Sequence, residues 1–298
     1  MMRIVLFGAK GQVGQELTAL AAARGVDLVA FERAQVDICD PAAVARALEA
    51  KRPDLVVNAA AYTAVDKAEK EAELATRANA QAPGLLAERC ARYGTPLVHI
   101  STDYVFDGTK TGAYVESDPI APLGIYGRTK AAGEAAVRAQ NERHLILRTS
   151  WVYGVHGANF LKTMLRLAGE RDRLTIVADQ RGCPTATRDI AEGILAAAQA
   201  VADGTARWGT YNLAGNGATT WHGFASEIVA QAARHTGRTP EVAPITTADY
   251  PTPAQRPANS ELDSSLFERT FGYRAPPWRS RVVEVVDGLL ASTLKEPT

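Results

Sequence analysis

Arg3-Ile-Val-Leu-Phe-Gly-Ala-Lys-Gly-Gln-Val-Gly14 joins a short apolar run directly to three glycines near the start of the chain. The continuous run Arg3–Phe7 predicts a strand buried on both faces, and the glycines predict a tight turn that opens a helix. Glycines at Gly8, Gly11 and Gly14 let the backbone approach a pyrophosphate, whose charge the helix N-terminus stabilises. We therefore predict a dinucleotide-binding turn, with a plain glycine-rich turn as the alternative.

Short apolar runs alternate with Ala-rich amphipathic segments through the first half of the chain. This rhythm predicts an α/β, Rossmann-like fold with a doubly wound parallel sheet and right-handed crossovers. The expected strands are Arg3–Phe7, Asp27–Phe31, Leu55–Asn58, Leu97–Ile100 and Leu145–Arg148. The expected helices are Gln12–Arg24, Pro41–Lys51, Leu74–Tyr93 and Tyr126–Gln140.

After Trp151 the rhythm becomes irregular, and the Pro-rich segment Tyr250–Pro257 must form a loop. We expect residues 1–150 to form the dinucleotide-binding domain, and residues 151–298 to form mainly a smaller, discontinuous substrate-binding lobe over the carboxyl ends of the strands. We expect the chain to return to the central sheet near residues 174–213. The elements expected to fit the sheet's edge are a helix at Phe160–Glu170, a strand at Leu174–Val177, a helix at Arg188–Ala202 and a strand at Tyr211–Leu213.

The composition restricts which classes of partner and which cellular compartment we expect for this protein. Among 298 residues, 33 Lys and Arg balance 33 Asp and Glu, so no basic field attracts nucleic acid or an anionic membrane. No stretch of about 18 apolar residues appears, and the first apolar run is too short for a signal peptide. Three cysteines without paired spacing fit a reducing compartment. We expect a soluble cytoplasmic protein with no nucleic-acid or membrane partner.

Charged residues follow the second expected strand, where a dinucleotide places its adenosine ribose. Glu32 could accept hydrogen bonds from the ribose, which favours NADH, whereas Arg33 could pair with a 2′-phosphate, which favours NADPH. These opposing signals leave the choice between NADPH and NADH open. Asp37 and Ile38 lie where the next loop could clamp the adenine. Small residues in Asn58-Ala-Ala-Ala-Tyr-Thr63 let a cofactor lie flat across the backbone.

Tyr126 and Lys130 follow a strand that ends in Ser101 and Thr102. The pair is one helical turn apart, so the two side chains share one helix face. An ammonium about 5 Å away contributes roughly 3 kcal/mol, which would lower the phenol pKa from about 10 to about 8. Tyr126 would then donate a proton to a carbonyl whose oxygen Thr102 holds, as in a nicotinamide-dependent carbonyl reductase.

The motifs, taken in order, resemble those of the extended short-chain dehydrogenase/reductases. The resemblance runs from the first strand to the C-terminal lobe, and it implies NAD(P)H-dependent reduction of the 4-keto group of dTDP-4-dehydro-L-rhamnose to dTDP-L-rhamnose. The further segments that carry it are Asn58-Ala-Ala-Ala-Tyr-Thr-Ala-Val-Asp-Lys-Ala-Glu69, Arg148-Thr-Ser-Trp-Val-Tyr153, Asp179-Gln-Arg-Gly-Cys-Pro-Thr185 and Tyr250-Pro-Thr-Pro-Ala-Gln-Arg-Pro257.

The resemblance also implies a role for each matching residue. Thr102, Tyr126 and Lys130 would be catalytic, and the last two would also touch the cofactor. The dTDP-sugar would meet Thr102, Asp103 and Trp151. The dinucleotide would be lined by Gly11, Gln12, Val13, Glu32, Asp37, Ile38, Ala61, Tyr62 and Thr63.

Two other functions stay open beside this reduction. One is another nucleotide-sugar reductase or epimerase of the same fold, and the other is a non-catalytic regulatory subunit that binds NADP. Nucleotide-sugar 4,6-dehydratases follow the catalytic Thr with an Asp-Glu pair, whereas here Thr102 is followed by Asp103 and Tyr104. Without a second carboxylate no base for elimination is evident, so simple ketone reduction is favoured.

Some members of the family bind magnesium between subunits through carboxylates. Glu16 fits one such position, but Arg188 stands at the matching place, and a guanidinium is not a ligand for a hard cation. We therefore expect no metal, with Asp189 or Glu192 as alternative ligands, and a homodimer stays open. The five histidines show no metal spacing and are expected to be structural or exposed.

Arg256, in the Pro-rich loop, is the best cation for a substrate pyrophosphate. Its guanidinium binds in a bidentate way, and the flanking prolines fix its direction. Trp151 could stack on the ligand or fill the interface of the lobe. Gln180, Thr185 and Asn259 are further polar candidates for the sugar or base.

Overall fold

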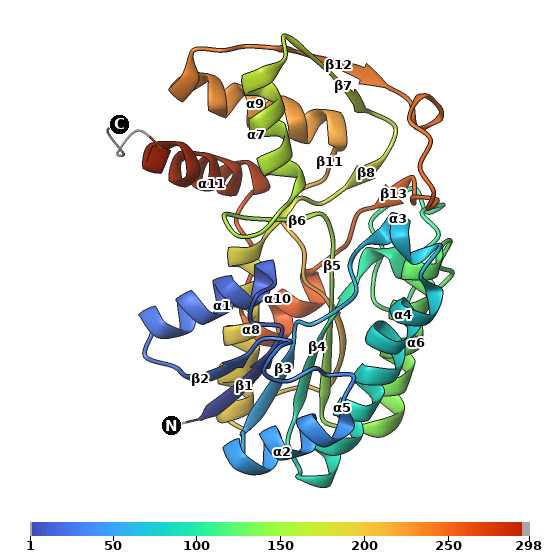
Figure 1. The fold of residues 1–298 in the computed structure, drawn as a ribbon, viewed down its shortest axis with the longest axis vertical. Coiled ribbons are helices and arrows are strands. Elements are labelled where there is room, and N and C mark those ends of the chain that lie inside the picture. The colour runs from blue at the N-terminus through green and yellow to red at the C-terminus, as the bar shows by residue number, and fades with distance from the viewer. Residues whose placement is uncertain (1, 294–298) are drawn as a thin grey trace.

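A six-stranded parallel sheet forms the centre of the larger of two bodies in the computed structural model, which describes residues 2–293 (Figure 1). We call this larger part the sheet body. The strands lie in the order β2-β1-β3-β4-β5-β10, and the order reverses between β1 and β3. They are β1 (Arg3–Phe7), β2 (Asp27–Phe31), β3 (Leu55–Asn58), β4 (Leu97–Thr102), β5 (His144–Thr149) and β10 (Gly209–Asn212).

Helices cover both faces of the sheet, as the continuous apolar strands predict. On one face, α1 and α8 pack against strand residues such as Ile4, with Ile190 of α8 in the same core. On the other face, Val5 packs with Leu86 of α5 and Val137 of α6. The predicted Rossmann-like, doubly wound α/β fold is confirmed. These helices are α1 (Gln12–Ala23), α2 (Pro41–Lys51), α5 (Ala82–Arg92), α6 (Ile125–Gln140), α8 (Thr187–Ala202) and α10 (Ser265–Phe271).

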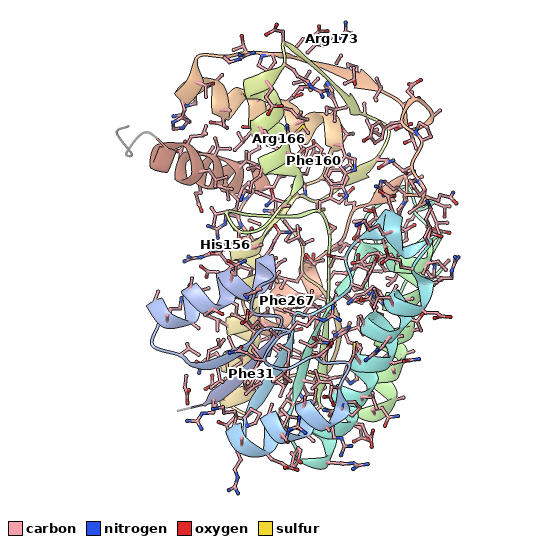
Figure 2. All side chains as sticks on the ribbon, viewed as in Figure 1. Phe31, His156, Phe160, Arg166, Arg173 and Phe267 are labelled. Carbon is pink, nitrogen blue, oxygen red and sulfur yellow. The ribbon has the colours of Figure 1, made fainter. Side chains whose placement is uncertain are left out.

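The smaller body has a core of its own, built around Tyr153, Phe224 and Trp278. Figure 2 shows Phe160 in this body and Phe267 in the sheet body. The elements of the smaller body are α7 (Phe160–Glu170), β7 (Arg173–Val177), α9 (Trp221–Thr236), β12 (Glu241–Ile245) and α11 (Trp278–Thr293). Short elements lie around the junction: α3 (Val65–Ala68), η2 (Asp103–Val105), β6 (Val152–Tyr153), β8 (Arg181–Gly182), β9 (Thr185–Ala186), β11 (Thr219–Thr220), η3 (Thr247–Asp249) and β13 (Asn259–Ser260).

Two elements expected at the sheet's edge lie elsewhere. Strand β7 pairs in parallel with β12 and not with the central sheet, and α7 packs beside it. The reason is burial: Leu161, Met164 and Leu174 join the core of the smaller body. Helix α8 and strand β10 do return to the sheet body, and β10 pairs with β5. The division at residue 150 stays a prediction.

The helix expected at residues 74–93 is interrupted. It consists of α4 (Ala72–Thr76), the π-helical turn η1 (Arg77–Gln81) and α5. Pro83 near the start of α5 offers no backbone N–H, which favours such a break. Helix α6 packs very closely on this turn, because a Cβ atom on Gly133 would lie 2.0 Å from the carbonyl oxygen of Asn79. Within the described part of the chain, no helix has the length and apolar character that a membrane span requires.

Candidate active site

The turn between β1 and α1 lies against the end of β3, where the strand order reverses. Gly8 has a φ of +94°, and a Cβ atom there would lie 2.6 Å from the amide nitrogen of Ala60. A Cβ atom on Gly14 would lie 2.1 Å from the carbonyl oxygen of Gly8. Side chains at these positions would break the turn. The bare backbone therefore leaves a cradle at the carboxyl ends of the strands, where open α/β sheets bind ligands.

The first residues of α1 lie in this cradle. Gly11 is the N-cap, and no side chain among residues 2–293 caps the helix there. Its first amide groups are therefore free to bind an anion. Gln12 accepts a 3.0 Å hydrogen bond from Asn159, the residue that caps α7 in the smaller body. Val13 packs against the core of the sheet body.

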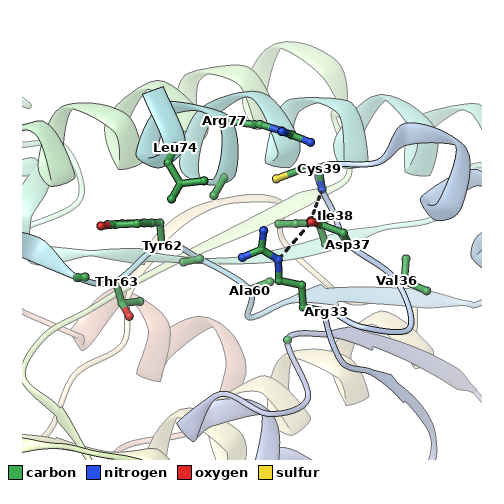
Figure 3. Close-up of a pocket in the computed structure, with 14 residues that line it drawn as sticks. Arg33, Val36, Asp37, Ile38, Cys39, Ala60, Tyr62, Thr63, Leu74 and Arg77 are labelled. Atoms are coloured by element: carbon green, nitrogen blue, oxygen red, sulfur yellow. Dashed lines mark hydrogen bonds and ion pairs between the residues drawn. The ribbon is translucent and has the colours of Figure 1, made fainter. Parts of the chain in front are cut away.

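A cavity of about 270 Å³ opens beside this turn (Figure 3). It brings together residues predicted to bind the dinucleotide and adds Cys39, Leu74 and Arg77, which the sequence analysis missed. Arg77 belongs to η1, a segment without a nucleotide-binding motif, so no local signal pointed to it. The predicted residues that line the cavity are Gly8, Arg33, Asp37, Ile38, Ala61, Tyr62 and Thr63.

Charged side chains around this cavity favour an anionic ligand. Lys10 forms an ion pair with Glu32 and so neutralises the carboxylate expected to bind the ribose. Arg33 Nε lies 3.2 Å from Asp37 Oδ2. Burial opposes ionisation of Asp37, but hydrogen bonds from the Cys39 backbone and the Arg33 guanidinium lower its pKa overall. Arg77 also lines the cavity and forms no ion pair among the described residues, so its positive charge gives the cavity a field that suits phosphate.

Thr102 and Tyr126 come together at the carboxyl end of β4. Thr102 Oγ1 donates a 2.9 Å hydrogen bond to Asp103 Oδ1, and it lies close enough to Tyr126 to offset part of the effect of burial on the phenol pKa. Tyr104 packs edge-on against Tyr126, with ring centroids 5.5 Å apart. Gly127 makes this approach possible, because a Cβ atom there would lie 2.2 Å from the carbonyl oxygen of Tyr104.

Lys130 lies one turn after Tyr126 on α6, but its amine is directed toward β4. Nζ donates a 2.6 Å hydrogen bond to the carbonyl oxygen of Ile100 and lies 3.5 Å from His99 Nε2. Burial lowers the pKa of Lys130 to about 8. Burial also raises the pKa of Tyr126 above its usual value. The expected lowering of the phenol pKa is therefore wrong for this arrangement, because burial disfavours the phenolate while the amine binds the strand.

A second cavity, of about 510 Å³, lies between the sheet body and the smaller body. Arg256 and Tyr104 line it together with Phe160 and Trp221. Arg256 Nη2 lies 2.9 Å from Asp66 Oδ2, whereas its buried Nη1 has no hydrogen-bond partner among the described residues. A buried guanidinium N–H without a partner is costly unless a polar ligand reaches it.

Trp151 stacks on Trp221, with ring centroids 3.6 Å apart. Its φ of +48° is unusual for a bulky residue, and Gly182 leaves room for the indole. Trp221 Nε1 donates a 3.2 Å hydrogen bond to Gln180, and both residues line the second cavity. Trp221 was not predicted, because only the folded chain brings it to Trp151.

Other candidates bind parts of the protein instead of an open site. Thr185 donates to the backbone carbonyl of Cys183, and Asn259 donates to those of Lys110 and Gly112. Neither side chain lines either of the two cavities. Both side chains therefore connect segments around the junction, and their role as ligand contacts stays a prediction.

The carboxylates considered for magnesium are engaged by neighbouring side chains. Glu16 accepts a 3.0 Å hydrogen bond from a threonine of α8, and Arg188 lies 2.8 Å from Glu192. Asp189 is buried and lies 2.8 Å from Arg281. Residues 2–293 contain no group of three or more His, Cys, Asp or Glu side chains that could hold a metal ion.

His99 is a site residue that the sequence analysis missed. It is fully buried in β4 between Asn58 and Lys130. The available signal was its position two residues before Ser101, because alternate residues of a strand share one face. Ser101 meets Glu134 of α6, the helix that also carries Lys130, so this face of β4 points at the site.

Comparison with known proteins now places this geometry in a family. A family model described as the RmlD substrate binding domain matches residues 2–291. The dTDP-4-dehydrorhamnose reductase of Burkholderia thailandensis is 45% identical over 298 residues, which cover 97% of this chain and 100% of that protein. The chain belongs to the dTDP-4-dehydrorhamnose reductase family. The resemblance to this family, expected from the sequence, is confirmed.

Solved structures of the dTDP-4-dehydrorhamnose reductase family share the fold. The Clostridium acetobutylicum protein is 38% identical, with a TM-score of 0.90 over 97% of this chain and 99% of that one. The Bacillus anthracis protein, solved in complex with NADP, is 34% identical, with a TM-score of 0.87 over 95% and 98%. The predicted enzyme class, an NAD(P)H-dependent oxidoreductase, is confirmed.

Proposed function

We propose that this protein reduces the 4-keto group of dTDP-4-dehydro-L-rhamnose to a hydroxyl, forming dTDP-L-rhamnose, with NADPH or NADH. The neighbouring hydroxyls of Thr102 and Tyr126 carry the proposal. They lie beside Tyr104, which lines the second cavity, and one helical turn before Lys130. Relatives that are 40–45% identical bear the name of this activity.

Each residue of the site has one task in the reduction. Tyr126 gives its phenolic proton to the ketone oxygen, and the Thr102 hydroxyl would turn from Asp103 to donate a hydrogen bond that polarises the same oxygen. The nicotinamide, when bound, supplies the hydride for the carbonyl carbon. Lys130 in its ammonium form would offset part of the cost of the buried phenolate that Tyr126 becomes, although burial keeps the phenol pKa above its usual value. Tyr104 stands where a dehydratase carries its second carboxylate, which favours reduction over elimination.

The first cavity and the turn beside it fit a dinucleotide. The amides at the start of α1, with Gln12 and Val13, would hold the pyrophosphate. Asp37 and Ile38 would hold the adenine, and Arg33, which pairs with Asp37 through Nε, would use its other N–H groups for a 2′-phosphate. Tyr62 and Thr63 lie across the cavity from this loop (Figure 3), and Ala61 also lines the cavity.

The second cavity fits the nucleotide part of the sugar substrate. The unpartnered Nη1 of Arg256 would bind the pyrophosphate, and Phe160 and Trp221 offer flat apolar surfaces for the base. Asp103 and Trp151 would stand near the sugar. We propose residues 151–298 as the main substrate lobe, and a homodimer stays a prediction.

The test is a coupled assay of cofactor oxidation with enzymatically made dTDP-4-dehydro-L-rhamnose. NADPH and NADH are compared in parallel, and UDP- and GDP-linked 4-keto sugars serve as controls. We expect cofactor oxidation that depends on the dTDP-sugar. Equal turnover of a UDP- or GDP-sugar would favour another reductase, and NADP binding without turnover of any sugar would favour a regulatory subunit.

A further inference from the structure

We propose that His99 is a positioning residue for the reduction: Asn58 fixes its imidazole in the Nε2–H tautomer, and this N–H donates to Lys130 and favours the neutral amine. The inference rests on the proposed role of Lys130 beside Tyr126. It makes Lys130 a group that gains and loses its proton near physiological pH, where an ordinary lysine would remain a cation throughout.

The amide of Asn58, at the end of β3, has one orientation. Its Oδ1 accepts a 3.1 Å hydrogen bond from the backbone amide of Ala60, so Nδ2 faces His99 Nδ1, also at 3.1 Å. An amide nitrogen only donates, so Nδ1 accepts and the ring proton of neutral His99 lies on Nε2. The reversed amide would leave the Ala60 amide without this acceptor.

The other side of the imidazole faces Lys130. Nε2 lies 3.5 Å from Nζ, which donates its 2.6 Å hydrogen bond to the Ile100 carbonyl. An N–H group repels an ammonium but donates to the lone pair of a neutral amine. His99 is fully buried and Lys130 is 2% exposed, so water screens this contact little. The tautomer therefore disfavours the charged form of Lys130.

Glu134 is the charged group that acts on Lys130 in the opposite direction. It lies one turn further along α6, and its charge draws the pKa of Lys130 upward against burial. Arg148 of β5 lies 2.7 Å from this carboxylate and Arg138 lies 3.2 Å from it. Ser101 of β4 donates to it at 2.6 Å. These partners offset the charge of Glu134. Burial and the contact with His99 therefore outweigh Glu134 in setting the protonation state of Lys130.

Two titratable groups beside Lys130, His99 and Tyr126, carry no charge at neutral pH. Burial and the Lys130 charge hold the pKa of His99 well below its usual value, so the ring stays neutral. Burial raises the pKa of Tyr126, which therefore stays a phenol. The tautomer of His99 is thus the feature that a substitution at Asn58 can change in order to alter the protonation of the Lys130 amine.

The tautomer can be measured without turnover, by ¹⁵N NMR of the full chain labelled at histidine nitrogens. The His99 signals are those absent from the His99→Asn spectrum. We expect the Nε2–H pattern in the wild type and an Nδ1–H pattern in Asn58→Asp, because a carboxylate accepts from Nδ1 and still accepts from the Ala60 amide. An Nδ1–H pattern in the wild type, or no change in Asn58→Asp, would overturn the inference even if the enzyme reduces its sugar as proposed.

The pH–rate profile tests the effect on Lys130. His99→Asn keeps an acceptor for Asn58 and removes the donor from Lys130, so the basic limb of kcat/KM should move upward by about one pH unit. His144→Asn is the matched control, since this buried histidine of β5 bonds only to the Asn141 carbonyl at 2.6 Å and should leave the profile in place. Identical profiles for the two variants would overturn the inference. If His99→Asn does not fold, single substitutions of the other four histidines assign the His99 signals by exclusion, and the wild-type spectrum then decides the inference.

Discussion

The Lys130 amine donates a 2.6 Å hydrogen bond to the carbonyl oxygen of Ile100, which ties helix α6 to strand β4 just before Thr102. Burial lowers the pKa of this amine to about 8. The ammonium form is needed to stabilise the phenolate, so kcat/KM for reduction should fall as pH rises through about 8. A Lys130→Met variant should be slower and should lack this limb. A profile that is flat well above that pH in the wild type would contradict the assignment.

Tyr126→Phe should keep dinucleotide affinity and reduce turnover by about a hundredfold or more, because the variant lacks only the proton donor. Stopped-flow reduction and calorimetric binding of NADP⁺ measure the two effects separately. Tyr211→Phe is the matched control, since that hydroxyl donates to the Arg207 carbonyl far from Thr102. Unchanged turnover in Tyr126→Phe would remove the phenol from the mechanism.

Asp103→Asn should stabilise the protein at neutral pH. Burial raises the pKa of Asp103 to about 6 from an unfolded value of 3.8, so stability falls as pH rises between these two values. At pH 7 the ionised carboxylate costs about 3 kcal/mol, which the amide avoids while still accepting from Thr102. Urea unfolding at pH 4 and pH 7 measures the difference between variant and wild type. An equal difference at both pH values would refute this account.

Gly127→Ala should lower the free energy of unfolding by about 1–3 kcal/mol and reduce activity, because its Cβ atom meets the Tyr104 carbonyl and displaces Tyr126. Gly169→Ala is the control. No described atom outside its helix and its immediate neighbours lies within 4 Å of a Cβ atom there, and α7 should gain up to about 1 kcal/mol. Thermal unfolding and turnover of the two variants are compared. Similar effects at both glycines would count against the close approach of α6 and η2.

Arg33→Ser should weaken binding of 2′,5′-ADP about tenfold or more and leave binding of 5′-AMP nearly unchanged, because only the former carries the 2′-phosphate. Calorimetry measures both constants without any turnover. Arg46→Ser, on the exposed face of α2, is the control and should change neither. An equal loss for the two nucleotides would place Arg33 at the adenine instead and remove the argument that Arg33 favours NADPH.

Much of the sheet body could be predicted because its signals are local. The apolar run Arg3–Phe7 and the glycines after it specify strand and turn within a dozen residues. Strand β7 could not be placed in the same way. Its residues fit any partly buried strand, and its pairing with β12 depends on the core that α7 and α9 form around it. The break at η1 likewise depends on close packing against Gly133.

In the candidate site, too, the features set by local sequence could be predicted, whereas those set by distant parts of the chain could not. Helical spacing was sufficient to place Tyr126 and Lys130 on one face of α6. The direction of the Lys130 amine was not predictable, because its partners Ile100 and His99 lie on a strand about thirty residues earlier. Arg256 was selected for its charge, but its ion pair with Asp66 and its unpartnered nitrogen exist only in the folded chain.

The two bodies are interlaced along the chain. After β5 the chain enters the smaller body, returns to the sheet body for α8 and β10, and leaves again for α9 and β12. It then contributes α10 to one core and α11 to the other. No single contiguous segment therefore holds the whole sugar side of the molecule. Grafting a stretch of a related gene to change substrate preference would split both cores, whereas replacing side chains around the second cavity leaves both intact.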